Sequence, residues 1–360
     1  MKIAFRVDAS CLIGAGHVMR CLVLANALRE QGHQILFVCR NYPGNLNKVI
    51  SKNEYAVREL SFKGARIYQE QNYSDDYDQW LWVTQQQDAN ETSLLLKSEQ
   101  LDWLIVDHYS LDYVWEKQLR VTSKKIMVID DLANRKHDCD ILLDQNYYSS
   151  MQKRYRRYVA CNTAMLLGPR YALIRDEILR SKNLRAAAQK KITSTPKVLL
   201  SMGGLDPDNM TLDILKYIKN NAVLSDYQVD VVVGLINPHR RMIENFCSKH
   251  NNLNFHRSPN YFISLLTAAE FVIGAGGISV YERCILGIPS LVFSLSDNQK
   301  QICSDVADFG AHIFLKKISD LKDGIQMLTN EKLNRLTEKS LSLFLNYVGA
   351  HGVVDAIQAS

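Results

Sequence analysis

A histidine follows two closely spaced glycines near the start of the chain, in a setting suited to proton transfer. Residues 8–17 read DASCLIGAGH, and the apolar residues that follow are spaced as in a helix. Gly14 and Gly16 allow the backbone to approach a ligand closely, and a helix start offers free N–H groups. His17 can take a proton from water, because the unperturbed pKa of histidine lies close to neutrality. A turn cap or a packed core position is the alternative role, and the sequence leaves both open.

Two further glycine-rich segments lie in the second half of the chain. Residues 199–207 read LLSMGGLDP, and residues 272–279 read VIGAGGIS. Two such loops on parallel strands of one sheet can hold a diphosphate through backbone N–H groups and a helix dipole. Glu282, about one turn into the next helix, can accept hydrogen bonds from ribose hydroxyls. The alternative is that the glycines only tighten turns and that Glu282 is solvated; neither loop has the GxxxxGK[ST] pattern of an ATP-hydrolysing P-loop.

Alternating strands and helices must position these residues. Apolar runs predict strands in the first half at residues 2–7, 34–39, 103–106, 125–129 and 141–143. In the second half they predict strands at 197–201, 228–233, 253–256, 270–273 and 290–293, followed by helices at 318–329, 332–347 and 352–359. This alternation is typical of α/β proteins with parallel sheets. We therefore expect two Rossmann-like, doubly wound domains facing across a cleft.

Composition excludes several classes of protein. The chain has 360 residues, of which 47% are hydrophobic and 22% charged, so two well-packed domains are expected rather than disorder. The formal charge of +5 is too small for a dedicated nucleic-acid binder. The eight cysteines show no metal-binding spacing, and no apolar run approaches the ~18 residues of a membrane span. We expect a cytoplasmic monomer.

The small positive excess is concentrated in one band. Residues 151–191 contain eleven Lys and Arg residues against two acidic ones, Asp176 and Glu177. A positive field of this kind can attract a ligand with phosphate charges. A solvated linker face is the plainer explanation, and both stay open.

Several motifs, in order along the chain, resemble the PseG/SpsG family. They are FRVDAS at 5–10, IGAGHVMRCL at 13–22, VDHY at 106–109, Asp130-Asp131, LDQN at 143–146, GPRYAL at 168–173, SMGGLD at 201–206, GAGGISVYE at 274–282 and SDNQ at 296–299. The resemblance covers roughly residues 1–301 and implies a GT-B-like fold related to the UDP-sugar transferase MurG. It also implies hydrolysis of a UDP-linked 2,4-diacetamido-2,4,6-trideoxyhexose of the β-L-altropyranose type, in pseudaminic acid biosynthesis, with no metal or other cofactor.

The resemblance assigns roles to particular residues. His17 is expected to activate the water, with Tyr109 and Asn298 beside the sugar as further catalytic residues. Substrate contacts are expected from the following residues: Arg6, Asp8, Gly14, Gly16, Gly203, Gly204, Gly276, Gly277, Ser279, Glu282 and Gln299. The expected partners are therefore the UDP-sugar and water. A GT-B glycosyltransferase that uses a UDP-amino sugar and a sugar or lipid acceptor is the alternative.

The domain boundaries follow from the break in alternation. We expect a catalytic domain at residues 1–165, a connection at 166–195, a UDP-binding domain at 196–340, and a terminal helix at 341–360 that crosses back to the first domain. Residues 63–91 match no motif; their Trp80 and Trp82 are expected to pack a helix onto the sheet, with membrane contact as the alternative. Asp107-His108, Asp130-Asp131 and His137-Asp138 lack a spacing that fixes a metal geometry, and helix capping is the expected role of these aspartates.

Overall fold

The computed structural model divides the chain into two compact units. It describes residues 1–63, 77–182, 185, 196–222, 224–235 and 237–360. The first unit comprises Met1–Leu173 and Tyr347–Ser360, and the second comprises Ile174–Asn346. Parts of the predicted connection, of the basic band and of segment 63–91 lie outside the described residues.

The first unit is built on a seven-stranded parallel sheet of order β3-β2-β1-β4-β5-β6-β7. Its strands are β1 (Lys2–Val7), β2 (Gln34–Arg40), β3 (Ala56–Leu60), β4 (Leu101–Asp107), β5 (Ser123–Ile129), β6 (Ile141–Asp144) and β7 (Ala164–Leu167). Strand β1 lies inside the sheet between β2 and β4, and Val7 is paired in register with Asp107 on β4. The carboxyl ends of β1 and β4 therefore lie side by side.

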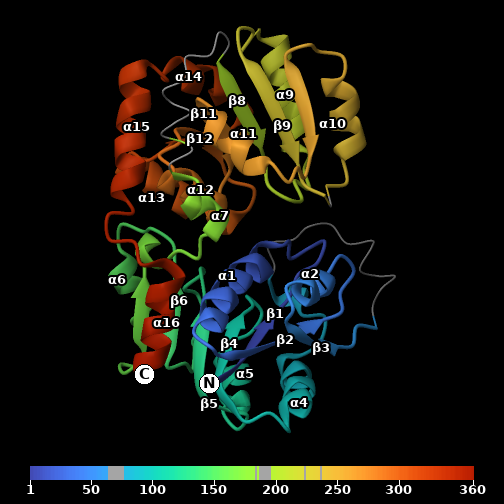
Figure 1. Cartoon of the computed structure of the whole chain (residues 1–360), viewed down its shortest axis with the longest axis vertical. Helices are drawn as coiled ribbons and strands as arrows, with labels where there is room; N and C mark the ends of the chain where they lie inside the picture. The colour runs from blue at the N-terminus through green and yellow to red at the C-terminus, as the bar shows by residue number, and fades with distance from the viewer. Residues whose placement is uncertain (64–76, 183–184, 186–195, 223, 236) are drawn as a thin grey trace. The chain divides into compact units, whose positions relative to one another are not determined.

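Helices cover both faces of this sheet. They are α1 (Gly16–Glu30), α2 (Asn47–Lys52), η1 (Tyr77–Trp80), α4 (Gln85–Leu96), α5 (Tyr113–Leu119), α6 (Met151–Arg154), η2 (Pro169–Tyr171) and α16 (Gly349–Ala359). Helix α16 lies beside α1 (Figure 1) and contributes Val353, Val354 and Ile357 to the same core as Phe5. The opposite face packs Ala4 against Leu104 and Trp115, as the alternation of a buried strand requires.

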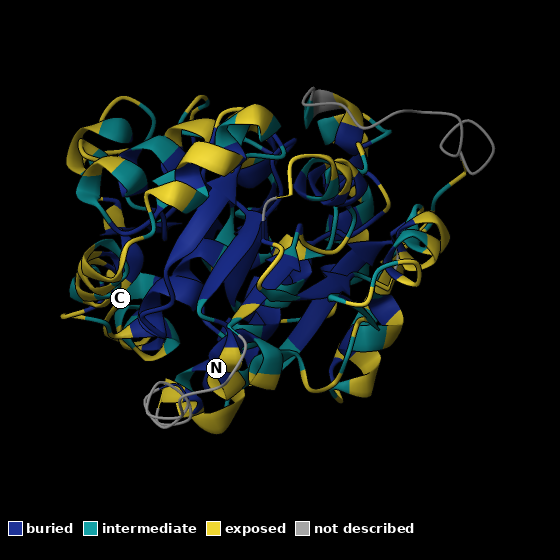
Figure 2. Ribbon diagram, turned by 90° about the horizontal axis from the view of Figure 1, so that it is seen from above, coloured by how far each residue is buried: buried dark blue, intermediate teal, exposed yellow. Residues whose placement is uncertain are grey.

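The second unit has a six-stranded parallel sheet of order β10-β9-β8-β11-β12-β13. Its strands are β8 (Lys197–Ser201), β9 (Gln228–Val233), β10 (Leu253–Arg257), β11 (Phe271–Ala275), β12 (Ser290–Phe293) and β13 (Ile313–Phe314). Its helices are α7 (Asp176–Arg180), α9 (Met210–Asn220), α10 (Arg240–Cys247), α11 (Phe262–Ala268), α12 (Ile278–Ile285), α13 (Asp297–Phe309), η3 (Ile318–Asp320), α14 (Leu321–Gln326) and α15 (Asn330–Ser342). Figure 2 shows buried strands in dark blue, with exposed residues on the outer faces of helices and in loops.

The predicted α/β class with two parallel sheets is confirmed, and most strands agree within one or two residues. Strands β3, β7 and β13 were not predicted; all three lie at sheet edges, where half-exposed residues such as those of β3 blur the apolar pattern. The helix expected at 318–329 is shorter and divided between η3 and α14. No helix among the described residues has the length and apolar character needed to cross a bilayer.

Candidate active site and nucleotide site

The loop between β1 and α1 carries His17 to the carboxyl edge of the first sheet. The Ser10 hydroxyl accepts hydrogen bonds from the backbone N–H groups of Leu12 and Ile13, at 3.1 and 2.9 Å. Gly14 donates from its backbone to the Ser10 carbonyl and has a φ of +79°, which favours glycine. Gly16 is exposed and begins α1, so His17 lies in the first turn of that helix.

His17 is held by a carboxylate at the end of the neighbouring strand. Its Nδ1 lies 2.6 Å from Oδ1 of Asp107, and its side chain is 9% exposed. Because the carboxylate can only accept, Nδ1 is the donor in this contact, and in the neutral ring the lone pair is then on Nε2. Among the described residues, no hydrogen-bond partner occupies Nε2 of His17. This geometry leaves Nε2 of a neutral His17 able to accept a proton.

Arg20 joins this carboxylate to a second one. It donates to both oxygens of Asp107, at 2.7 and 2.6 Å, and to Oδ2 of Asp131 at 2.6 Å. Burial opposes ionisation of Asp107, but Arg20 and then His17 hold its pKa well below the usual range. His17 and Arg20 are three residues apart on α1, so both side chains leave the same face of the helix.

Tyr109 packs edge-on against the ring of His17. Its hydroxyl donates to Oδ2 of Asp131 at 2.5 Å, and its ring centroid lies 4.5 Å from that of His17. Burial, followed by the charge of Asp131, raises the pKa of Tyr109 well above its usual value. The phenol therefore stays protonated and acts as a donor.

Trp80, whose role could not be assigned to a motif, lies in the same cluster. It is 5% exposed, stacks on Tyr109 with a centroid distance of 5.4 Å, and contacts the His17 ring edge-on. Its cluster also contains Leu12 and Ile13 of the β1–α1 loop. Trp80 is therefore packed in the interior, as expected. Its contacts are with the β1–α1 loop, His17 and Tyr109, whereas the expectation was that it packs a helix onto the sheet.

Arg6 and Asp8, which were expected to contact the substrate, lie enclosed within the first unit. Both side chains are fully buried, and Arg6 binds Asp8 at 2.8 Å and Asp88 at 2.8 Å. Asp8 also accepts a hydrogen bond from the Arg40 backbone at 2.6 Å. These contacts join the end of β1 to β2 and to α4.

In the second unit, both glycine-rich segments contribute residues to one cavity of about 330 Å³, although Gly276 and Gly277 are not in its lining. Its lining includes Gly203 and Gly204 after β8, together with Ser279 and Glu282 of α12. Gly277 has a φ of +78° and caps α12, and Gly276 lies just before it. The backbone at this helix start suits an anion.

Glu282 is paired with an arginine that sequence reasoning missed. Arg175 donates to both carboxylate oxygens of Glu282, at 2.7 and 3.1 Å, and lines the same cavity. Each oxygen retains a further acceptor direction, so Glu282 can still accept from a hydroxyl group. Arg175 follows the GPRYAL motif closely, which is the only signal that pointed toward it.

The loop after β8 was expected to help bind a diphosphate, but the first N–H groups of α9 already have a partner within the protein. Asp206 accepts from the backbone N–H groups of Met210 and Thr211, at 2.8 and 3.0 Å, and so caps α9 itself. The backbone of Gly204 instead lies close to that of Gly234. A Cβ atom on Gly234 would clash with the Gly204 carbonyl oxygen. Gly203 and Gly204 thus border the cavity, while the α9 start is already occupied by a carboxylate.

Asn298 and Gln299 lie on α13 of the second unit and outside the lining of this cavity. The Asn298 side chain accepts from the Ser296 hydroxyl. Gln299 packs against the glycine loop: a Cβ on Gly276 would lie 2.9 Å from its Oε1. Gln299 therefore supports the loop that carries Gly276 and Gly277.

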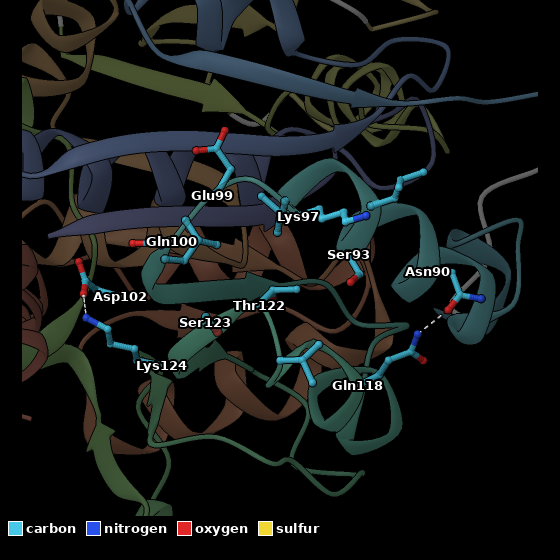
Figure 3. A pocket seen from close by; sticks show the side chains of 14 residues that line it. Asn90, Ser93, Lys97, Glu99, Gln100, Asp102, Gln118, Thr122, Ser123 and Lys124 are labelled. Carbon is cyan, nitrogen blue, oxygen red and sulfur yellow. Dashed lines mark hydrogen bonds and ion pairs between the residues drawn. The ribbon is translucent and has the colours of Figure 1, made fainter.

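A larger cavity, of about 1040 Å³, lies at the opposite end of β4 and β5 from Asp107. Figure 3 shows its polar lining, in which Lys124 pairs with Asp102 at 2.7 Å. None of the predicted site residues lines it.

The acidic motifs weighed as metal ligands have other partners. Asp130 accepts from the backbone of Leu132 and Ala133, and His137 contacts Glu116 at 2.7 Å. The described part of the chain contains no group of three His, Cys, Asp or Glu side chains that could hold a metal ion.

Solved structures define the class of fold. Acinetobacter baumannii MurG matches with a TM-score of 0.67 at 13% identity, covering 100% of this chain and 99% of its own. The spinosyn rhamnosyltransferase SpnG matches with a TM-score of 0.64 at 16% identity, covering 99% of this chain and 100% of its own. The fold is therefore that of GT-B glycosyltransferases, as predicted.

The chain belongs to the family described as "Protein of unknown function (DUF354)", whose model matches residues 144–329. It is 27% identical over 317 residues to the UDP-2,4-diacetamido-2,4,6-trideoxy-beta-L-altropyranose hydrolase of Campylobacter jejuni, covering 88% of this chain and 100% of that protein. It is 25% identical over 228 residues to the spore coat polysaccharide biosynthesis protein SpsG of Bacillus subtilis, covering 61% of this chain and 63% of that protein. The predicted resemblance to PseG and SpsG is confirmed.

Proposed function

We propose that this protein hydrolyses a UDP-linked 2,4-diacetamido-2,4,6-trideoxyhexose of the β-L-altropyranose type and releases UDP. The similarity to the Campylobacter jejuni hydrolase supports the substrate. The observation that carries the chemistry is the 2.6 Å contact between His17 Nδ1 and Asp107 Oδ1, which leaves Nε2 basic. A place in pseudaminic acid biosynthesis, a cytoplasmic location and a monomeric state are parts of this proposal.

The first unit supplies the base. Nε2 of His17 removes a proton from water as the water oxygen bonds to C1 of the sugar. The bond between C1 and the UDP oxygen breaks, and its electron pair leaves with UDP. Asp107 stabilises the imidazolium that forms, and Arg20 keeps Asp107 ionised throughout. Tyr109 and Asn298 are proposed to contact the sugar.

The second unit supplies the nucleotide site. Gly276, Gly277 and Ser279 are proposed to hold the diphosphate at the start of α12, where N–H groups and the helix dipole stabilise the leaving group. Glu282 is proposed to accept from the ribose hydroxyls, with Gly203 and Gly204 bordering the same cavity.

A glycosyltransferase is the second candidate. The fold neighbours are glycosyltransferases, and the chain is 24% identical over 292 residues to a Clostridium botulinum N-acetylglucosamine transferase, covering 78% of this chain and 75% of that protein. In that case His17 would deprotonate an acceptor hydroxyl in place of water.

Turnover in the absence of an acceptor distinguishes the hydrolase from the glycosyltransferase. Purified protein is incubated with the UDP-altropyranose sugar alone, and UDP release is followed over many turnovers. Hydrolysis predicts full turnover that is lost in His17→Ala and retained in His351→Ala, which alters an exposed histidine of the same unit. Turnover that requires an added sugar or lipid would contradict the hydrolase and favour the transferase.

A further inference from the structure

A buried arginine lies directly under the glycine loop of the second unit. Arg283 is on α12 and is only 4% exposed. It donates to the Ala275 carbonyl at 2.8 Å and to the Ser279 hydroxyl at 3.1 Å. The two acceptors flank Gly276 and Gly277: Ala275 is the last residue of β11, and Ser279 lies in α12, so Arg283 joins the two ends of the glycine segment.

This cation has no paired anion among the described residues. Glu282, its neighbour in sequence, directs both carboxylate oxygens to Arg175. The Nε atom of Arg283 is buried and has no hydrogen-bond partner in the described part of the chain. Burial lowers the pKa of Arg283. An uncompensated buried charge is costly, so its retention needs an explanation.

The absence of a side chain at Gly274 leaves space for the guanidinium of Arg283. A Cβ on Gly274 would lie 3.0 Å from Nη1 of Arg283 and 3.1 Å from the Ser201 carbonyl. Glycine at the end of β11 therefore makes room for the guanidinium between the ends of β8 and β11. Arg283 also lines the 330 Å³ cavity, together with Ser279 and Glu282.

We propose that Arg283 is the buried counter-charge for an anionic diphosphate bound at the start of α12. This inference rests on the proposed nucleotide site and adds a residue that sequence reasoning did not select. Arg283 acts as a positioning residue: it fixes Ala275 and Ser279 so that the loop N–H groups converge, and its charge attracts the phosphates through the loop. Bound diphosphate in turn neutralises a charge that is unpaired without it.

The test compares a variant that keeps the charge with one that removes it. Arg283→Lys retains the cation, and Arg283→Gln retains a hydrogen-bond donor without it. Arg241→Met is the control, because it removes one charge from an exposed position of the same unit. Binding of UDP and of uridine is measured by calorimetry, and folding by thermal unfolding without ligand.

The expected result is a loss confined to the charged ligand. Arg283→Gln should weaken UDP about tenfold or more and leave uridine within about twofold. Arg283→Lys and Arg241→Met should both bind UDP close to wild type. Equal UDP affinity in the Gln and Lys variants, a parallel loss of uridine, or loss of folding in both variants would overturn the proposal. Failure of the wild-type protein to bind UDP would instead overturn the proposed nucleotide site itself.

Discussion

His17 Nδ1 lies 2.6 Å from Oδ1 of Asp107, and Nη2 of Arg20 lies 2.6 Å from that same oxygen. One carboxylate therefore orients the proposed base and is itself kept ionised by a buried guanidinium. The arrangement needs two parallel strands in register, since Asp107 ends β4 beside Val7 of β1. It gives His17 a fixed tautomer before any substrate binds.

Replacing Asp107 by Asn should remove this control of the tautomer. We expect kcat to fall by about 10²–10⁴, because an amide can donate to Nδ1 and leave the proton on Nε2. Steady-state UDP release measures the effect, with Asp102→Asn on the same strand as the control, since Asp102 is half-buried and pairs with Lys124. A kcat of Asp107→Asn within threefold of wild type would show that His17 does not depend on Asp107.

Tyr109 should matter more for its ring than for its acidity. Its phenol stays protonated and donates to Asp131, so Tyr109→Phe removes one hydrogen bond and should cost about 1–2 kcal/mol of stability. Tyr109→Ala also removes the packing against His17 and Trp80 and should reduce kcat much further. Equal kcat values for the two variants, measured with thermal unfolding alongside, would contradict a positioning role for the ring.

Glu282 can be tested through the hydroxyl that it is proposed to bind. Glu282→Ala should weaken UDP by about 10–100-fold, because a hydrogen bond to a carboxylate is lost. Binding of 2′-deoxy-UDP is the matched measurement: it should be weak in the wild type and change little in the variant if the 2′-hydroxyl is the partner. Unchanged UDP affinity in calorimetry would remove Glu282 from the site.

Asp144 should give the first unit an unusual pH dependence. Burial, followed by the charge of Asp131, raises the pKa of Asp144 to about 7. Between about pH 4 and pH 7, the folded state therefore holds a proton on Asp144 that the unfolded state has released. The contribution of this group to the free energy of unfolding is fully present below about pH 4 and is lost as the pH rises to about 7.

The Asp144→Asn variant isolates this effect. Between pH 5 and pH 8 the wild type should lose stability that the variant keeps. The unfolding temperature of the variant minus that of the wild type should therefore increase with pH. Asp102→Asn serves as the control, because Lys124 holds the pKa of Asp102 below its usual range and it is ionised throughout this interval. A difference for Asp144→Asn that is constant with pH would contradict the raised pKa.

The central strands and the glycine loops could be predicted because their signals are local. Residues 2–7 form β1 as expected, and the loop and helix that follow place His17 at the carboxyl ends of the central strands. Edge strands escaped prediction because only part of each is buried, as in β3. The terminal segment from Tyr347 joins the first unit, and Val353 packs in its core.

Partners that are distant in sequence could not be predicted with the same certainty. Asp107 was noticed as a motif residue, but its contact with His17 depends on the pairing of β1 with β4. Arg6 and Asp8 belong to a motif of the first loop and are fully buried, and burial of this kind depends on packing by β2 and α4 that the motif itself does not reveal. Arg175 and Arg283 carried no spacing signal, and only the fold brings them to the cavity.

The most direct test follows the fate of the water oxygen. The wild-type protein is given the UDP-altropyranose sugar in ¹⁸O-labelled water without an acceptor, and the products are analysed by mass spectrometry. The account predicts that each turnover places one ¹⁸O on the released sugar and none on UDP, and that His17→Ala abolishes this incorporation. Label in UDP, or no release of UDP without an acceptor, would contradict it.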